Sequence, residues 1–481
     1  MKIFFSGIAG SGVSAIAGFM ADRGHSITGS DRVFDANPLH PMKKVLEAKG
    51  IEIVPQDGSG IDKTFDCAVF STAVEEDNSE LLKAQSSGIP ISTRPEYLAW
   101  IASSFKTIAV AGTSGKSTTS GMLAYLMKRL GLSPNFIGGG RVKQFRSPLS
   151  TGNCLTGDSE YLVIEACESD GTIIYYRPNY SIVLNLDLDH HPVDETAEMF
   201  RTLARNTLHG VIINADDNHL KQVFLSPLPA AEGIYVSPDT VGASGSVTQG
   251  KGLDNVITFS IYNPSLYRAE DIVYKQFSTG FLLRGTRFVL SLPGEYNLYN
   301  ALACIAFLSE IGVKIQDVAA VLPEFQGIDR RFDVHLNDGE RLVIDDYAHN
   351  PHKILSLMKT MQKLAGRICY IFQPHGFGPT RMMKKEYTDV FVNNLRDTDL
   401  LVLFPIYYQG GTAVRDISSR DLEEGVKKGG KLAITIELRD DVMKCINDYD
   451  AFVVFGARDE TLSEFAVRIA ERIAGESRDY S

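Results

Sequence analysis

Short apolar runs alternate with segments of helical spacing along most of the chain. In the first hundred residues, the expected strands lie at 2–7, 25–31 and 66–72, and the expected helices at 13–24, 42–50 and 79–88. Strands that alternate with helices of this length are typical of a parallel sheet covered on both faces. We therefore expect a first α/β domain over residues 1–105.

The same alternation resumes at residue 106 and predicts a second domain over 106–322. Its expected strands lie at 106–112, 161–166, 180–186 and 210–216. The helix after Lys116 carries a buried stripe that includes Met122, Leu126 and Leu130, and Gly131 is well placed to end it. Between 221 and 292 the pattern changes to short alternating runs with a glycine-rich stretch at 242–252, which predicts an antiparallel insertion. A helix at 297–312 then restores the α/β pattern.

A third α/β domain is expected over 323–481. The runs at 341–346, 367–372, 399–404 and 451–456 are apolar enough to be central strands of a parallel sheet. Asn350 followed by Pro351 is a good cap and first position for a helix. The fold class is therefore α/β with three domains: two Rossmann-like domains flanking a phosphate-loop domain.

Composition and charge exclude several classes of protein. The 481 residues are 44% hydrophobic and 22% charged, as in ordinary globular proteins. The net charge of −11 argues against nucleic acid as the main partner. There is no apolar run long enough for a transmembrane helix, so no membrane partner is expected. The six cysteines are scattered without a C-x-x-C pair, which indicates reduced thiols and a cytoplasmic location.

The most informative stretch is VAGTSGKSTTSG at 110–121. A phosphate needs free backbone N–H groups at a helix N-terminus and a lysine for the β/γ oxygens. Residues 112–115 supply the turn-permissive backbone, Lys116 the charge, and Ser117 a hydroxyl for Mg²⁺. Val110 occupies the position where the common motif has its first glycine, so the loop is a shortened one. The alternative is an ordinary βα turn with an incidental lysine.

A second glycine-rich turn, GIAGSG at 7–12, also follows a strand and opens a helix. Asp31 ends the next strand, near the offset at which an acidic residue meets a ribose hydroxyl. The spacing is G-x-x-G-x-G rather than G-x-G-x-x-G. A dinucleotide site, another nucleotide diphosphate and plain βα packing all stay open on this pattern alone.

Taken together, these motifs resemble those of the Mur ligase family, which builds the peptide stem of the bacterial cell wall. The family's shortened phosphate loop, G-T-x-G-K-[ST]-T, matches residues 112–118. Further matches run the length of the chain: SITGSD (26–31), VFSTAV (69–74), EACESD (165–170), NLDLDH (185–190), LPGEYNLYNALA (292–303), FQGIDRRF (325–332), DDYAHNP (345–351) and FQPH (372–375).

The resemblance implies an ATP- and Mg²⁺-dependent ligase of peptidoglycan precursor synthesis. ATP phosphorylates the carboxylate of UDP-N-acetylmuramate, and L-alanine or another small amino acid then displaces phosphate from the acyl phosphate. By the family pattern, Lys116 holds the β/γ-phosphates, and the metal ligands are Ser117, Glu165 and His190, with His191 as the alternative to His190. The partners are small-molecule substrates, and the chain is a monomer or a homodimer.

The resemblance also assigns the remaining site residues. The ATP-binding set comprises Gly112, Thr113, Ser114, Gly115, Lys116, Ser117, Thr118, Asn297, Asn300, Arg330, Asp346 and Tyr347. Arg330, or its neighbour Arg331, would reach the γ-phosphate, and His349 and His375 would face the acyl phosphate. The UDP-sugar set comprises Gly10, Ser11, Gly12, Ser30, Asp31 and Ser71.

Several positions depart from the pattern of the alanine-adding ligases. That pattern has histidine at Ser114, Tyr296 and Asn350, and aspartate at Cys167. Its Q-P-H-R-Y-x-R-T-R stretch has Gly376 and Pro379 here in place of two arginines, while Arg381 is kept. Because arginine is the natural holder of a carboxylate, this change leaves a murein tripeptide ligase, or one for another amino acid, as the alternative. A nucleotide-binding regulator without turnover is a third possibility, disfavoured by the complete set of phosphate and metal residues.

Overall fold

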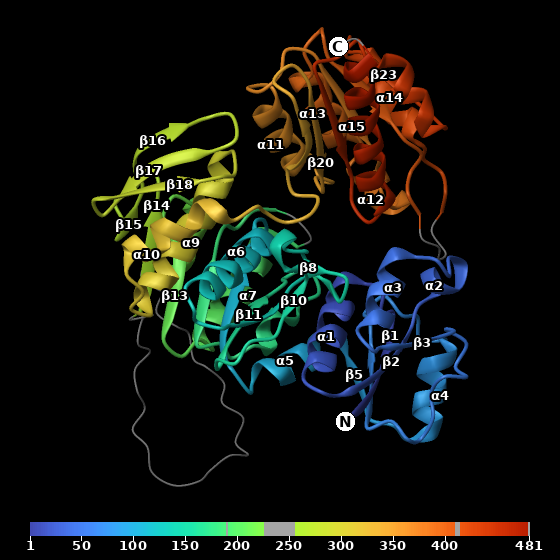
Figure 1. The fold of residues 1–481 in the computed structure, drawn as a ribbon, viewed down its shortest axis with the longest axis vertical. Coiled ribbons are helices and arrows are strands. Elements are labelled where there is room, and N and C mark those ends of the chain that lie inside the picture. Colours follow the sequence, from blue (N-terminus) through green and yellow to red (C-terminus); the bar gives the residue numbers. More distant parts are fainter. Residues whose placement is uncertain (189–190, 226–254, 409–413, 480–481) are drawn as a thin grey trace. The chain divides into compact units, whose positions relative to one another are not determined.

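The computed structural model describes residues 1–188, 191–225, 255–408 and 414–479. The chain divides into two compact units, Met1–Ile328 and Asp329–Ser481. Figure 1 shows the mixture of sheets and covering helices, which confirms the α/β class expected from the sequence. The expected domains 1–105 and 106–322 both fall within the first unit.

The first sheet is wholly parallel, with strand order β3-β2-β1-β4-β5. Its strands are β1 (Lys2–Ser6), β2 (Ser26–Ser30), β3 (Glu52–Val54), β4 (Cys67–Phe70) and β5 (Ile91–Thr93). The strand order reverses beside β1, which pairs with both β2 and β4. In open α/β sheets, ligands bind at the carboxyl end of the strands at such a reversal. The turn at 7–12 lies there.

The helices of this region begin at residues suited to capping. They are α1 (Ser11–Asp22), α2 (Arg32–Ala36), α3 (Pro41–Ala48), α4 (Ser79–Ser87) and α5 (Arg94–Ala102). Asp31 caps α2 and Asn78 caps α4 through side-chain oxygens that accept backbone N–H groups. Thr93 and Glu96 form a capping box at the start of α5.

The second sheet has the order β10-β7-β11-β6-β12-β13-β14-β15 and is parallel except for β10. Its strands are β6 (Lys106–Ala111), β7 (Asn135–Ile137), β10 (Cys154–Leu155), β11 (Tyr161–Glu165), β12 (Tyr180–Val183), β13 (Gly210–Asn214), β14 (Val256–Ser260) and β15 (Tyr267–Arg268). The short strands β8 (Arg146–Ser147) and β9 (Ser150–Thr151) form a separate hairpin. The central strand β6 leads directly into the predicted phosphate loop.

The antiparallel insertion is smaller than the sequence pattern indicated. It consists of β16 (Glu270–Tyr274), β17 (Thr279–Leu283) and β18 (Thr286–Leu290). By contrast, β14 continues the parallel sheet, because its apolar residues pair in register with β13. The expected loop at 242–252 lies outside the described residues. The helices of this region are α6 (Lys116–Arg129), α7 (Val193–Arg205), α8 (Asn218–Phe224), α9 (Glu295–Glu310) and α10 (Ile315–Val321), with short 3₁₀ turns at Lys143–Phe145, Thr172–Tyr175 and Leu322–Glu324.

Helix α1 of the first sheet packs against the edge of the second. A Cβ added at Gly18 would lie 3.1 Å from the Cys154 sulfur, so a glycine permits the close approach. Asn153 donates to the carbonyl oxygen of Ser11 at 2.7 Å and to the hydroxyl of Ser14 at 3.0 Å. Buried apolar residues of both sheets belong to one hydrophobic cluster. This shared core explains why the first two regions form one unit.

The second unit is built on a six-stranded sheet of order β19-β20-β24-β21-β22-β23, in which only the pairing of β19 with β20 is antiparallel. Its strands are β19 (Asp333–Asn337), β20 (Leu342–Asp346), β21 (Ile368–Phe372), β22 (Leu400–Leu403), β23 (Ala433–Thr435) and β24 (Ala451–Phe455). Its helices are α11 (Pro351–Met361), α12 (Phe377–Met382), α13 (Lys384–Asn394), α14 (Ser419–Lys428) and α15 (Thr461–Asp479), with a 3₁₀ segment at Arg439–Cys445.

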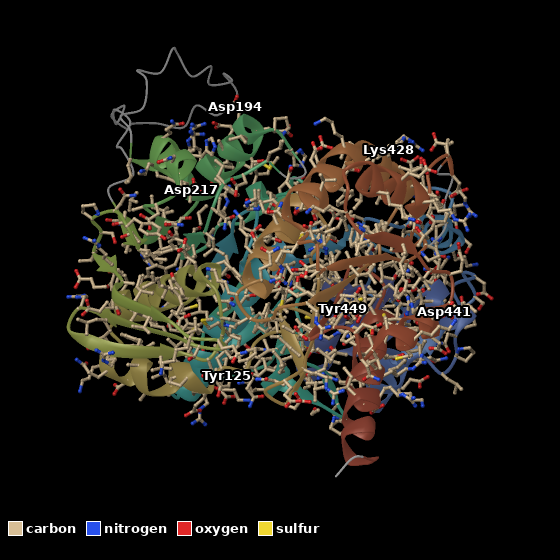
Figure 2. The ribbon with its side chains drawn as sticks, turned by 90° about the horizontal axis from the view of Figure 1, so that it is seen from above. Tyr125, Asp194, Asp217, Lys428, Asp441 and Tyr449 are labelled. Carbon is tan, nitrogen blue, oxygen red and sulfur yellow. The ribbon has the colours of Figure 1, made fainter. Side chains whose placement is uncertain are left out.

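Local sequence signals hold in this unit. The side chain of Asn350 accepts the N–H of Lys353, and Pro351 opens α11, which confirms the predicted helix start. Tyr449 packs against the cluster formed by the sheet and α15 (Figure 2).

No helix in the described part of the chain combines the length and the apolar character needed to cross a bilayer. All six cysteines are free thiols.

Candidate active site

The turn between β6 and α6 has the backbone of a phosphate-binding loop. Gly112 and Gly115 adopt φ values of +136° and +86°, which side chains disfavour. A Cβ added at Gly115 would lie 2.6 Å from the side-chain oxygen of Asn300, so the loop has no room for one. Lys116 is the first residue of α6, and Thr118, also in the first turn, is half-buried. The loop therefore presents a helix N-terminus, a natural anion site.

Asn185, from the segment after β12, fixes this loop in place. Its Oδ1 accepts the hydroxyl of Thr113 at 2.9 Å and the N–H of Ser114 at 2.8 Å. Its Nδ2 donates to the carbonyl oxygen of Ser114 at 3.1 Å. Asp217, which caps the N-terminus of α8 and is labelled in Figure 2, holds the next residue by accepting the N–H of Leu186 at 2.9 Å. The loop and the segment beside it are thus held by side chains that follow β12 and β13.

Lys116 is held by a carboxylate. Its Nζ donates to both oxygens of Glu168, at 2.8 and 3.0 Å, and to the carbonyl oxygen of Gly112 at 2.6 Å. Burial is the largest single effect on the pKa of Lys116 and lowers it, but the charge and hydrogen bond of Glu168 together with Glu165 and other acidic groups nearby outweigh burial, and the pKa is raised. The Glu168 side chain is only 2% exposed. The lysine therefore stays charged at the mouth of the loop.

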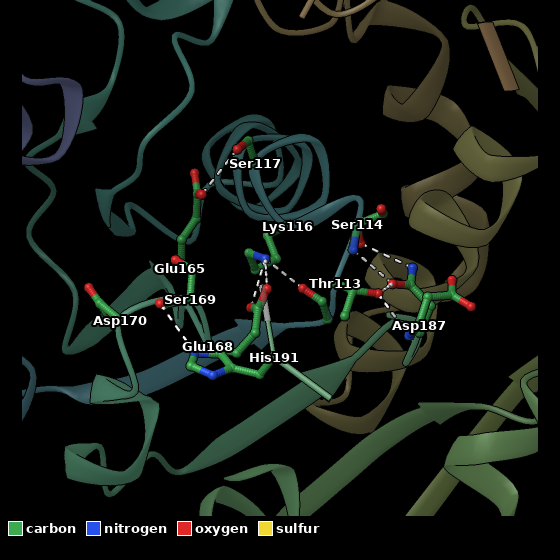
Figure 3. A network of polar contacts seen from close by, with 12 residues as sticks. Thr113, Ser114, Lys116, Ser117, Glu165, Glu168, Ser169, Asp170, Asp187 and His191 are labelled. Atoms are coloured by element: carbon green, nitrogen blue, oxygen red, sulfur yellow. Dashed lines mark hydrogen bonds and ion pairs between the residues drawn. The ribbon is translucent and has the colours of Figure 1, made fainter. Parts of the chain in front are cut away.

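Ser117 meets a second carboxylate. Its hydroxyl donates to Glu165 Oε2 at 3.0 Å, and Figure 3 shows Ser117 and Lys116 directed to different glutamates around the head of α6. Glu165 Oε1 accepts the N–H groups of Gly139 at 2.7 Å and Gly140 at 3.3 Å. A hydroxyl and an anchored carboxylate are oxygen donors of the kind that Mg²⁺ prefers. The pair therefore fits a Mg²⁺ site, although the described residues contain no cluster of three or more acidic, histidine or cysteine ligands.

The predicted metal site includes His190 or, as the alternative, His191. His190 lies outside the described residues. His191 is described, and its Nδ1 lies 3.0 Å from Glu195 Oε1 while Nε2 lies 3.3 Å from the carbonyl oxygen of Ser169. Both ring nitrogens of His191 thus have protein partners other than Glu165.

Asn297 and Asn300 lie on α9, which packs beside α6. Asn300 Oδ1 accepts the hydroxyl of Thr119 at 3.0 Å, and its Nδ2 donates to Asn297 at 3.3 Å. Asn297 in turn donates to the carbonyl oxygen of Pro293 at 2.8 Å. Each is 4% exposed. The two amides therefore stabilise the N-terminal turn of α6 through Thr119.

In the first sheet, the turn at 7–12 is organised by Asp31. Its two carboxylate oxygens accept the N–H groups of Ala9 at 2.9 Å and Val33 at 3.0 Å. Burial raises the pKa of Asp31, and these two hydrogen bonds oppose the rise. Gly10 caps α1, followed by Ser11 and Gly12 in its first turn. The three residues therefore stand at a helix N-terminus.

Arg94 covers Gly12 and ties the turn to the second sheet. A Cβ added at Gly12 would meet the Arg94 side chain at 3.4 Å. The guanidinium of Arg94 lies 2.6 Å from a carboxylate oxygen of Asp170, the last residue of the EACESD stretch. Ser30 is fully buried at the end of β2, and Ser71 lies against Gly7, where an added Cβ would meet it at 2.8 Å. The predicted UDP-sugar residues thus gather at the carboxyl end of the first sheet.

Arg330 is enclosed within the second unit. Its Nε donates to Asp345 at 3.2 Å, Nη1 to the carbonyl oxygen of Asp459 at 2.9 Å, and Nη2 to that of Gly456 at 2.8 Å. Arg330 is 5% exposed and Asp345 is fully buried. The guanidinium therefore braces the carboxyl ends of β20 and β24.

The neighbouring Arg331 and the DDY stretch are arranged differently. The Arg331 guanidinium lies 4.9 Å from the ring centroid of Tyr347 and is half-buried. Asp346 accepts the N–H groups of Phe332 and Ala348, both at 2.7 Å. Burial raises the pKa of Asp346, and the charge of Arg331 opposes the rise. Arg331 thus lies beside Asp346 and Tyr347.

His349 and His375 meet at the same edge of the second unit's sheet, since they follow β20 and β21. Their ring centroids are 5.3 Å apart at an interplanar angle of 76°. The Nδ1 of His349 lies 2.9 Å from the carbonyl oxygen of Tyr347. Burial, together with the positive charge of Lys353, lowers the pKa of His349 to about 3. The ring of His349 is therefore neutral at physiological pH.

Comparison with known proteins decides the family. The family model described as Mur ligase family, catalytic domain matches residues 2–106, and that described as Mur ligase, glutamate ligase domain matches residues 330–475. A protein of Agathobacter rectalis named UDP-N-acetylmuramate–L-alanine ligase is 31% identical over 446 residues, which cover 89% of each chain. The chain belongs to the Mur ligase family.

Further relatives of this Mur ligase include alanine ligases and a murein peptide ligase. A UDP-N-acetylmuramate–L-alanine ligase of Fusobacterium nucleatum is 30% identical and covers 99% of this chain and 98% of its own. The crystal structure of UDP-N-acetylmuramate–alanine ligase from Thermotoga maritima is similar with a TM-score of 0.77 at 26% identity, covering 99% of this chain and all of that one. A murein peptide ligase of Psychrobacter arcticus shares the fold, with a TM-score of 0.67 at 22% identity and 98% of both chains covered.

Two residues at the core of this Mur ligase site escaped the sequence reasoning. Glu168 was within a recognised stretch, but the sequence could not distinguish which of its two glutamates meets Lys116. Asn185 is the first residue of the NLDLDH stretch. Its position near the end of a predicted central strand could have indicated that it lies beside the loop at 112–118. Both are positioned by pairing between β6, β11 and β12, which brings the ends of separate strands together.

Proposed function

We propose that the chain is an ATP-dependent ligase that joins L-alanine to the carboxylate of UDP-N-acetylmuramate. The observation that carries the proposal is the head of α6, where Lys116 and Ser117 each face a separate buried glutamate. The relatives at 30–31% identity bear the name of this reaction. A charged lysine and an oxygen-lined cation site side by side are what a magnesium triphosphate requires.

The chemistry proceeds in two steps. An oxygen of the substrate carboxylate attacks the γ-phosphorus of ATP. The bond between the γ-phosphorus and the bridging oxygen breaks, and ADP leaves with its electron pair. The neutral amine of alanine then attacks the acyl carbon, inorganic phosphate departs, and the amine loses a proton. Phosphoryl transfer depends mainly on position and charge neutralisation, so Lys116 would exchange Glu168 for the phosphate oxygens.

Ser117 and Glu165 would hold Mg²⁺, with His190 as the further predicted ligand. The ion would neutralise charge on the β- and γ-phosphates. We assign the γ-phosphate contact of the second unit to Arg331, since the three hydrogen-bonding sides of Arg330 already have protein partners. Asp346, Tyr347, His349 and His375 would face the nucleotide and the acyl phosphate.

Each expected domain has a proposed substrate. Residues 1–105 would bind the UDP moiety through the N-terminus of α1, residues 106–322 would bind ATP, and residues 323–481 would bind the amino acid. Asn297 and Asn300 would act through the loop that they support. The enzyme would work in the cytoplasm on small-molecule substrates, as a monomer or a homodimer.

The test is phosphate release from ATP, Mg²⁺ and UDP-N-acetylmuramate with each amino acid in turn, followed by the product mass. We expect release with L-alanine, and Lys116→Ala should abolish it while leaving UDP-sugar binding nearly intact. Lys128→Ala is the matched control, because Lys128 is exposed near the other end of α6. Absence of ADP with every acceptor contradicts the proposal, as does equal loss of UDP-sugar binding in Lys116→Ala.

A murein tripeptide ligase is the second candidate. Gly376 and Pro379 favour it, because they stand where the alanine-adding pattern has arginines. The tripeptide L-alanyl-D-glutamyl-diaminopimelate therefore belongs in the same panel of acceptors. Preferred release with the tripeptide would replace L-alanine as the assigned acceptor.

A further inference from the structure

An arginine from a later segment of the second unit lies beside the loop at 376–381, which lacks two arginines of the family pattern. Arg415 lies 4.9 Å from the ring centroid of Tyr408 and 5.8 Å from that of Phe377. The two rings lie 5.3 Å apart in an edge-to-face arrangement. Phe377 is the first residue of α12, between Gly376 and Pro379. The guanidinium of Arg415 therefore lies beside the loop in which Gly376 and Pro379 replace the two arginines of the family pattern.

Arg381, the arginine that the loop keeps, has other partners. Its Nε donates to Asp416 at 2.8 Å and its Nη2 to the carbonyl oxygen of Val414 at 2.9 Å. Arg381 therefore anchors the segment on both sides of Arg415. Arg415 itself has no carboxylate partner in the described part of the chain. A guanidinium that rests its face on aromatic rings keeps its in-plane N–H donors available for a carboxylate.

Backbone hydrogen bonds connect this cluster to the histidine pair. The N–H of Gly376 donates to the carbonyl oxygen of Tyr407 at 2.9 Å, and the N–H of Tyr407 donates to that of Pro374 at 2.8 Å. These bonds join the loops after β21 and β22 at the carboxyl edge of the sheet. His375 and Tyr408 are therefore adjacent to one paired stretch of backbone.

We propose that Arg415 binds the α-carboxylate of the amine acceptor, in place of the arginines absent at 376 and 379. The inference rests on the proposed function and adds to it the residue that recognises the acceptor's acid group. Tyr408 and Phe377 position the guanidinium, and Arg381 positions the segment that carries it. Bidentate pairing with a carboxylate is the recognition for which arginine is best suited.

The test compares L-alanine with L-alaninamide as acceptors for the full-length enzyme. Arg415→Ala should raise KM for L-alanine roughly ten- to a hundredfold, with KM for ATP and UDP-N-acetylmuramate nearly unchanged. The ratio of kcat/KM for L-alanine over L-alaninamide should fall by a similar factor, because the amide lacks the charge. Comparing ratios between variants cancels the intrinsic difference in reactivity of the two amines. Arg415→Lys should keep part of the preference.

Arg420→Ala is the matched control, since Arg420 is exposed on α14 and its ion pair with Glu437 is long, at 3.8 Å. It should leave the ratio unchanged. An unchanged ratio in Arg415→Ala, or an equal loss with both acceptors, overturns the inference while wild-type ligation continues. Failure of the wild-type enzyme to form ADP with any acceptor refutes the proposed function instead, so the two failures are distinguishable.

Discussion

Replacing Arg330 with methionine should destabilise the second unit, and more so at high pH. Methionine keeps much of the length of the side chain but removes the charge and every donor. Asp345, fully buried beneath Arg330, then has no cation, and the carbonyl oxygens of Asp459 and Gly456 lose the donors that Arg330 supplies. Breaking a buried pair by removing one partner costs about 3–5 kcal/mol, chiefly because a charge is left uncompensated.

The pH dependence follows from Asp345. Burial raises its pKa from 3.8 to about 6, against the opposing charge of Arg330. The folded state therefore binds the proton more tightly than the unfolded chain, and this contribution to stability is present below pH 4 and lost as pH rises through 6. The difference amounts to about 3 kcal/mol at pH 8. Without Arg330 the pKa rises further, so the variant should lose about 3–5 kcal/mol at pH 8 and clearly less at pH 5.

Urea unfolding followed by circular dichroism at the two pH values measures the loss, and hydrogen exchange of β20 locates it. At pH 8 the melting temperature should fall by roughly 10 °C. Asp345→Asn added to Arg330→Met should restore part of the stability at pH 8, because it removes the unpaired charge. If Arg330→Met keeps full stability at both pH values but loses turnover, the arginine acts on substrate and the reasoning is wrong.

Two further predictions concern the loop and the histidine pair. Gly115→Ala should lower ATP affinity at least tenfold and cost about 1–3 kcal/mol of stability, since the new Cβ meets Asn300 at 2.6 Å in a positive-φ backbone. Gly131→Ala, also at positive φ but with nothing within 4 Å, is its control for unfolding and calorimetry, and equal effects in the two variants contradict the steric argument. His349, with its pKa lowered from 6.5 to about 3, should show no titration between pH 5 and 8 by NMR, and stability should fall as pH drops below 6.5, because the unfolded chain takes up the proton first. A His349→Gln variant assigns the resonance, and an inflection near 6.5 in the wild type would count against burial of the ring.

The sequence by itself determined the alternation of strands and helices and the glycine-rich turn at 112–118. Strand and helix periodicities are local, so the central strands and the start of α11 at Asn350 follow from a few neighbouring residues. The loop at 112–118 is equally local, because glycines and a lysine between a strand and a helix dictate its backbone. The extent of the antiparallel insertion was not local, since only pairing with β13 places β14 in the parallel sheet.

Tertiary structure decided which of several adjacent side chains makes each contact. Arg330 and Arg331 are neighbours in sequence, but the backbone around them takes unusual positive φ values, +57° at Arg330 and +51° at Phe332. No periodicity predicts which side chain such a backbone turns inward. In the same way, Glu168 meets Lys116 and Arg415 meets Phe377 only because strands distant in sequence end at one edge of a sheet. Side-chain direction in irregular segments and contacts between strand ends depend on the whole fold. The pattern of residues along the chain therefore predicts neither of them.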